Sequence, residues 1–227
     1  MKIAAVNFVL LLALISCTSK AKKPAADTTI VSTSAAHKAE KFDLANLTMN
    51  ESIDDLLKAN ALSLKDGSDK ESTVMGFESF ATSKPELLVY DKQSLVGGAG
   101  KEKNLLVLHY GQETHQIEMY EIKLYVAYQA GLLEHSLQKK LKKPIFIKDS
   151  SLNKSTIELD ENGDEVKGER NDTKFQVWDD TRSGLSYFLL EKKTDNKVVY
   201  EELTVINRKS ENAAMWIKFR GFDGYKK

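Results

Sequence analysis

The sequence contains a single cysteine, Cys17, and this constrains the fold more than any other feature. One thiol cannot form an intramolecular disulfide, so a domain built from this chain must be held together by its apolar core. Cys17 follows an apolar run from Ile3 to Ile15, which is preceded by the basic Lys2 and interrupted only by Asn7. This length and flank are typical of a secretory signal, because a membrane-spanning helix needs about 20 apolar residues.

The residues at the end of this run, Leu14-Ile15-Ser16-Cys17, resemble the lipobox of bacterial lipoproteins. In that family the cysteine thiol carries diacylglycerol, the signal is cut just before the cysteine, and the new amine receives an acyl chain such as palmitate. The resemblance implies a signal peptide over residues 1–16, lipidation at Cys17 and a lipid anchor without a membrane-spanning helix. It leaves no thiol for a metal site or a nucleophile. The alternative is an ordinary signal peptide with an incidental cysteine.

Residues 17–41 are predicted to form a lipidated, flexible tether, because they are rich in Ala, Ser, Thr and Lys and lack a hydrophobic pattern. Lys20, Lys22 and Lys23 either contact anionic headgroups or form part of a solvated spacer. The resemblance to lipoproteins implies an outer-membrane location, since Thr18 rather than an acidic residue follows the cysteine. The absence of an acidic cluster from residues 18–24 favours a position that faces the periplasm.

Charge gives little further guidance, because 33 basic residues balance 33 acidic ones and the isoelectric point is near 6.9. Nucleic-acid-binding proteins usually carry a basic patch or excess, so we expect no nucleic-acid partner. The remaining residues, 42–227, are enough for one sizeable core or two small repeated units.

From residue 42 onward the pattern predicts an α+β domain. Thr48-Met49-Asn50-Glu51 has the form of a capping box and predicts a helix that ends near Asn60. Leu133, Leu137 and Leu141 predict a second helix that ends before Pro144. Alternating or apolar stretches predict strands at about residues 74–80, 86–90, 104–110, 116–127, 156–160, 175–178, 186–190, 198–206 and 215–219.

This order suggests two helix-then-antiparallel-strand units, over residues 42–127 and 128–227, that form a sheet covered on one face by two helices. The layout resembles the tandem helix-and-sheet architecture of the β-lactamase inhibitor protein. A single unit is similar to the small lipoprotein of the outer-membrane-protein assembly machine. The resemblance concerns the order of elements and implies no site residues.

Three motifs have both a structural and a functional interpretation. Asp160-Glu161-Asn162-Gly163-Asp164 matches the start of a calcium loop, but its continuation fits a hairpin turn at Asn162-Gly163 better. Gly97-Gly98-Ala99-Gly100 invites comparison with phosphate-binding loops, but a strand rather than a helix is predicted after it, which favours a flexible hairpin loop. The aromatic and basic residues of 220–227 suit either partner binding or a terminus folded back onto the sheet.

Among the four histidines, only His109 and His115 suggest a metal site, because a hairpin centred on Gln112 places them opposite each other. Two ligands alone do not make such a site, and solvated strand-end residues are the favoured interpretation. We therefore expect no catalytic residues, no bound metal and no cofactor.

Two function classes follow. The preferred prediction is a non-enzymatic binding or assembly module, anchored to the membrane by its N-terminal lipid, whose partner is another envelope protein. The alternative is a lipoprotein enzyme or metal-dependent hydrolase with a site near His109 and His115. Capture of a small apolar ligand between helices and sheet is a third possibility.

Overall fold

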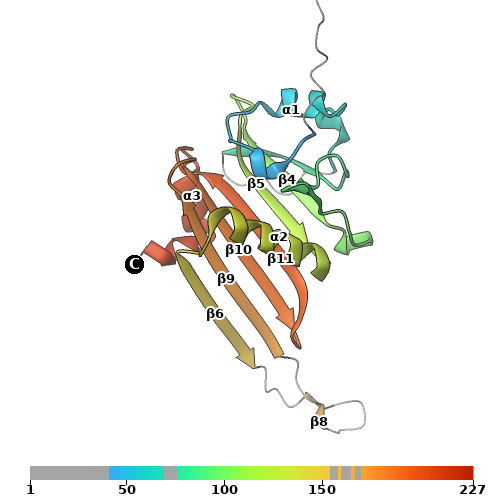
Figure 1. Ribbon diagram of the computed structural model, residues 1–227, viewed down its shortest axis with the longest axis vertical. Helices are drawn as coiled ribbons and strands as arrows, with labels where there is room; N and C mark the ends of the chain where they lie inside the picture. The colour runs from blue at the N-terminus through green and yellow to red at the C-terminus, as the bar shows by residue number, and fades with distance from the viewer. Residues whose placement is uncertain (1–40, 69–75, 154–157, 160–164, 167–169, 227) are drawn as a thin grey trace, which may run out of the picture. The chain divides into compact units, whose positions relative to one another are not determined.

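The computed structural model describes residues 41–68, 76–153, 158–159, 165–166 and 170–226 (Figure 1). Residues Glu40–Lys227 form one compact unit. The predicted signal peptide, Cys17 and all of the predicted tether except Lys41 lie outside the described residues.

The unit is built on a seven-stranded antiparallel sheet and belongs to the α+β class. Along the chain, the first three strands form one meander and the other four form a second meander. The last strands of the two meanders, β5 and β11, pair with each other at the centre of the sheet, where Glu121 lies opposite Thr204. The order across the sheet is β1 (Phe77–Thr82), β4 (Leu105–Gly111), β5 (Ile117–Leu124), β11 (Lys197–Asn207), β10 (Leu185–Thr194), β9 (Arg170–Asp180) and β6 (Phe146–Asn153).

In the part of the chain that the structure describes, three α-helices accompany the sheet: α1 (Ile53–Ala59), α2 (Ala127–Leu141) and α3 (Ala213–Phe219). The same part contains four short 3-10 helices, which are η1 (Leu44–Asn46), η2 (Leu64–Asp66), η3 (Gly100–Glu102) and η4 (Phe222–Lys226). Two small ribbons lie outside the main sheet, formed by β2 (Val89–Tyr90) with β3 (Gln93–Ser94) and by β7 (Glu158–Leu159) with β8 (Glu165–Val166).

The larger core lies on the face of the sheet that α2 covers. Leu133 and Leu137 of α2 are buried there, as the spacing of four residues predicted. Ile53 and Leu57 of α1 belong to the same core, together with alternate residues of the strands such as Leu203. Side chains alternate along a strand, so every second one points to the opposite face of the sheet. The apolar side chains on that face must be buried by another element.

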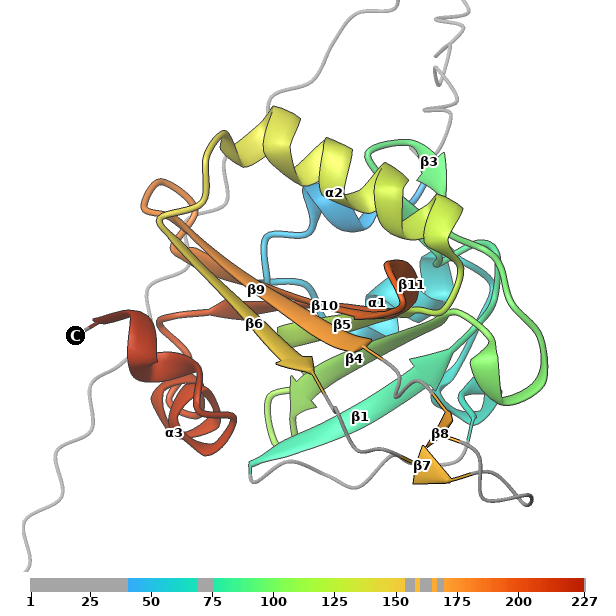
Figure 2. The ribbon, with the colours of Figure 1, turned by 90° about the horizontal axis from the view of Figure 1, so that it is seen from below.

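That second cover is α3, which lies on the opposite side of the sheet from α2 (Figure 2). Residues 215–219 were predicted to be a strand, and this prediction is wrong. The buried residues of α3, Ala213, Trp216 and Ile217, follow the i, i+3, i+4 spacing of a helix face. They pack against strand residues such as Phe188. The prediction placed two helices on one face of the sheet, and it therefore missed α3 on the other face.

Other differences have local causes. The helix predicted from the capping box starts later than expected, because Ser52 is the N-cap of α1 and its hydroxyl accepts from the Asp55 amide. Glu51 still accepts from the Thr48 amide, at 3.0 Å. Residues 86–90 do not join the main sheet, since β2 pairs only with β3.

Candidate functional site

The two histidines that suggested a metal site, His109 and His115, do not form a common site in the structure. His109 lies opposite Met119 in the β4–β5 ladder, and its buried ring packs edge-on against Phe77. His115 lies in the turn before β5, where its Nδ1 is 2.6 Å from the Asp54 carboxylate of α1. The hairpin therefore does not place His109 opposite His115, and the favoured interpretation of both as solvated strand-end residues is wrong for His109, which is buried within β4. His115 instead ties the turn to the start of α1, and its carbonyl oxygen also accepts from the Ile53 amide at 2.9 Å.

His109 belongs to a buried charge cluster between the sheet and the end of α3. Its Nε2 lies 3.7 Å from Oε2 of Glu121 on β5. A second oxygen of Glu121 lies 3.3 Å from the guanidinium of Arg220, the C-cap residue of α3, which also contacts Glu202 of β11. Lys123 approaches Glu121 to 3.7 Å. One arginine thus bridges carboxylates from two adjacent strands and fixes the end of the helix on the sheet.

The charges of this cluster shift the pKa values of Glu121 and Tyr200. Burial alone raises the pKa of Glu121, but the nearby His109, Lys123 and Arg220 outweigh it, and the pKa lies below the usual value. Glu121 therefore remains a carboxylate at neutral pH. Burial and the adjacent Glu202 carboxylate raise the pKa of Tyr200, whose hydroxyl donates to Glu202. The acid and base groups of the cluster are engaged with one another, which suits the docking of α3.

A second group of charges lies on the other face, beneath α2. Glu201 and Glu191 are directly opposite each other on β11 and β10, with exposures of only 1% and 7%. Lys193 pairs with Glu191 at 2.8 Å, and Lys174 pairs with Glu134 of α2 at 3.0 Å. Burial raises the pKa of Glu201 well above its usual value, and the charges of Glu134 and Glu191 add to this effect. The protonated form of Glu201 is therefore favoured, whereas Glu191 and Glu134 are each paired with a lysine.

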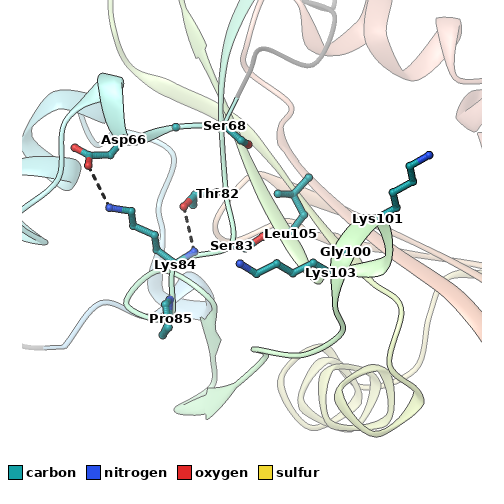
Figure 3. Close-up of a pocket in the computed structure, with 11 residues that line it drawn as sticks. Asp66, Ser68, Thr82, Ser83, Lys84, Pro85, Gly100, Lys101, Lys103 and Leu105 are labelled. Atoms are coloured by element: carbon teal, nitrogen blue, oxygen red, sulfur yellow. Dashed lines mark hydrogen bonds and ion pairs between the residues drawn. The ribbon is translucent and has the colours of Figure 1, made fainter.

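An accessible hollow of about 580 Å³ lies beside the end of β1 and the start of β4 (Figure 3). Its lining contains three lysines and one acidic residue. Lys84 pairs with Asp66 at 3.2 Å, Lys103 points across the hollow toward Ser83 and Lys84, and Lys101 points away. Its full lining is Asp66, Gly67, Ser68, Thr82, Ser83, Lys84, Pro85, Gly100, Lys101, Lys103 and Leu105.

The C-terminal aromatic residues have two different roles. Phe222 and Tyr225 pack against the core beneath α3, so this part of the terminus folds back onto the sheet. Met215 and Phe219, on the outer side of α3, are 47% and 72% exposed. This outward pair was not predicted from the sequence, because residues 215–219 were assigned to a strand. Treating Ala213, Trp216 and Ile217 as one helix face would have placed Met215 and Phe219 opposite them.

The predicted calcium loop, residues 160–164, lies outside the described residues. The strands that flank it, β7 and β8, pair antiparallel with Leu159 opposite Glu165, as a hairpin requires. No group of three or more His, Cys, Asp or Glu side chains arranged to hold a metal ion occurs among the described residues. Within the same part of the chain, no helix is both long and apolar enough to cross a membrane.

Comparisons with known proteins gave no match: no family model, no curated protein and no solved structure is significantly similar to this chain.

Proposed function

We propose that this protein is an envelope lipoprotein, anchored at the outer membrane through Cys17 and facing the periplasm, whose folded domain is a non-enzymatic binding or assembly module. The lipobox-like residues support the anchor. The internal pairing of the charged groups under α3 supports binding over catalysis, since Glu121, Glu202 and Arg220 are engaged in holding the helix. The alternative enzyme is not proposed, because His109 and His115 do not form a common site.

The observation that carries the binding role is the outward face of α3. Met215 and Phe219 are four residues apart and so lie on the same side of the helix. Trp216 and Ile217 hold the inner side in the core, and Arg220 fixes the end of the helix to two strands. Adjacent apolar side chains that are exposed on a fixed helix form a small apolar patch, and such patches suit contact with another protein. The occupant that we propose is another envelope protein.

Site-specific photo-cross-linking of the full-length protein in intact cells tests this role. A photoreactive residue at Phe219 should give a discrete cross-linked product, whereas one at Lys197, in the exposed end of the β10–β11 hairpin, should not. The product should disappear when Met215 is also changed to Asp, because a charge there disrupts an apolar contact. Equal products at Phe219 and Lys197, or a product that survives Met215→Asp, would contradict binding through α3.

The anchor is tested separately by Cys17→Ser. The variant should lose fatty-acid label and leave the membrane fraction, because the proposed attachment depends on acyl chains at this residue. Metabolic labelling with radioactive palmitate and sedimentation of lysed cells measure both effects. Continued labelling or unchanged sedimentation would refute the lipoprotein assignment without affecting the cross-linking result.

We further propose that the sheet consists of two related helix-then-strand units, 42–127 and 128–227. In support, α1 precedes the β1–β4–β5 meander and α2 precedes the β6–β9–β10–β11 meander. Both helices contribute to the same core, and the final strands of the two meanders pair at the centre. Under this proposal, α3 is an addition after the second unit.

A further inference from the structure

We propose that the lysine-lined hollow between β1 and η3 is a binding site for a phosphate-bearing anion. The inference is independent of the α3 face and of the lipid anchor. It rests on the charge of the lining, on the hydrogen bonds that fix its two walls and on its volume.

The lining carries more positive than negative charge. Lys84 and Lys103 present two ammonium groups to the hollow against the single carboxylate of Asp66, and Lys101 lies at its rim with its side chain pointing away. That carboxylate is already occupied, because it accepts from the Ser63 amide and hydroxyl, both at 2.9 Å, as well as from Lys84. These hydrogen bonds lower the pKa of Asp66, so it stays charged and orients Lys84. Lys103 has no ion-pair partner among the described residues, and its ammonium group reaches into the hollow (Figure 3).

One wall is fixed to the edge of the sheet. Ser68 donates from its amide and its hydroxyl to the Ala81 carbonyl, at 2.8 and 3.1 Å. Gly67 allows this close approach, because a Cβ atom there would lie 2.9 Å from the Phe80 ring. The Thr82 hydroxyl accepts from the Lys84 amide at 3.1 Å and fixes the turn that presents Lys84. Ser68 and the turn from Thr82 to Lys84 are therefore held against the edge of the sheet by hydrogen bonds.

The opposite wall is the glycine-rich stretch, residues 97–100, which was predicted to be a flexible hairpin loop. It leads from β3 of the small ribbon to β4 of the main sheet, and η3 begins at its last glycine. The fully buried Asn104 fixes the end of this stretch, and its backbone amide donates to the Gly97 carbonyl at 2.9 Å. Its side chain donates to the Leu95 carbonyl and accepts from the Tyr125 backbone amide, both at 2.8 Å. Gly98 has φ +72° and is in close contact with Glu102, which requires glycine. Lys103 is therefore next in the chain to Asn104, whose position is fixed by three hydrogen bonds.

These features suit an oxyanion better than a cation or an apolar molecule. Ammonium groups such as those of Lys84 and Lys103 donate to phosphate oxygens, and charge-assisted hydrogen bonds of this kind are about twice as strong as neutral ones. The volume of about 580 Å³ is large enough for a group with more than one phosphate. Both a free phosphate compound and a phospholipid headgroup offer this chemistry, and the experiment separates them.

The test is lysine acetylation footprinting by mass spectrometry on the detergent-solubilised full-length protein, with pyrophosphate as the probe. Pyrophosphate should protect Lys84 and Lys103 from acetylation, with an effect that weakens as salt is added. The exposed Lys197 should react at an unchanged rate. Absence of protection at Lys84 and Lys103, or equal protection of Lys197, would overturn the proposal.

Variants and lipid micelles complete the test. Lys103→Ala, at an exposed position, should weaken the pyrophosphate protection of Lys84 by roughly tenfold, whereas Lys101→Ala should weaken it less than about twofold. Equal effects of the two variants would contradict the assigned geometry. Micelles doped with phosphatidylglycerol, but not with phosphatidylcholine, should protect the same lysines if the natural ligand is an anionic headgroup. Protection by pyrophosphate alone would identify a free phosphate compound, and both results support the site.

Discussion

Arg220 connects three parts of the fold at the scale of one residue. It ends α3, its guanidinium contacts Glu121 and Glu202 on neighbouring strands, and it lies 5.3 Å from the centre of the Trp216 ring. The arginine side chain is 35% exposed, whereas the two carboxylates are 6% and 9% exposed. Water can therefore solvate the Arg220 guanidinium better than the two carboxylates. Loss of this ion pair should cost Glu121 and Glu202 more than it costs Arg220.

Arg220→Gln should destabilise the protein by about 1–3 kcal/mol, because it removes the cation that the buried carboxylates of Glu121 and Glu202 share. Chemical denaturation monitored by tryptophan fluorescence measures the change. Lys218→Gln, at an exposed position of the same helix, should cost less than about 0.5 kcal/mol. Similar losses in the two variants would mean that the bridge does not hold α3.

Glu201 gives a second residue-scale prediction, which concerns pH. Because its pKa is raised in the folded state, the unfolded chain releases this proton first as the pH increases. The stabilising contribution of the protonated form is thus complete below the ordinary glutamate pKa of about 4.3 and falls by about 1.4 kcal/mol per pH unit above it, up to the folded pKa. Charged groups that face Glu201 are Glu134 on α2, Glu191 and Lys193 on β10, and Lys174 on β9.

Glu201→Gln keeps the neutral shape and removes this titration. The variant should therefore gain stability relative to wild type as the pH rises from about 4.5 to 7. Unfolding free energies at several pH values measure the gain, with the exposed Glu86→Gln as a control for the loss of a charge. A constant difference between Glu201→Gln and wild type across this range would contradict the raised pKa.

At the scale of elements, α2 was predictable and α3 was not. The leucine spacing of α2 is regular over several turns, and Leu133 and Leu137 are both buried as predicted. The inward face of α3 is set by only three residues, and short apolar runs fit helix and strand equally well. None of residues 146–151 in β6 is deeply buried, and no strand was predicted there because the sequence shows little alternation.

The same distinction applies to the candidate sites. The glycine stretch was noticed in the sequence, but its role depends on Asn104 contacts with Leu95 and Tyr125, which are set by tertiary structure. The separation of His109 from His115 depends on strand register, because a shift of one residue moves a side chain to the other face.

Leu137→Ala tests the buried face of α2. The leucine is fully buried, so its truncation should cost about 2–5 kcal/mol through lost transfer energy and a residual cavity. Lys139 is 69% exposed and pairs with Asp91 at 3.4 Å, so Lys139→Ala should cost less than about 1 kcal/mol. Urea denaturation of both variants compares the two positions, and equal costs would mean that α2 is rotated about its axis.

At the scale of the whole molecule, the two meanders share one hydrogen-bonded sheet through β5 and β11. The core on the α2 side also runs across both meanders, since it includes Leu108 of β4 and Leu189 of β10. Neither meander has a separate core on this side. We therefore expect the described part of the chain to unfold in one cooperative step.

Leu108→Ala and Leu189→Ala test this cooperativity from the two halves. Both leucines are fully buried, and each substitution should lower the stability by about 2–5 kcal/mol. In each variant, far-ultraviolet circular dichroism and tryptophan fluorescence should report the same single transition. Two separate transitions in either variant would show that the meanders unfold independently.

The pairing of β5 with β11 also determines when folding can finish. During synthesis from the N-terminus, β5 is made long before its partner, because the second meander and α2 lie between the two strands in the sequence. The centre of the sheet thus closes only after residue 207 is available, and α3 can dock only after that. A chain of this topology stays incompletely folded until both meanders have been made, and under the proposed export this delay would keep it extended enough to cross a membrane.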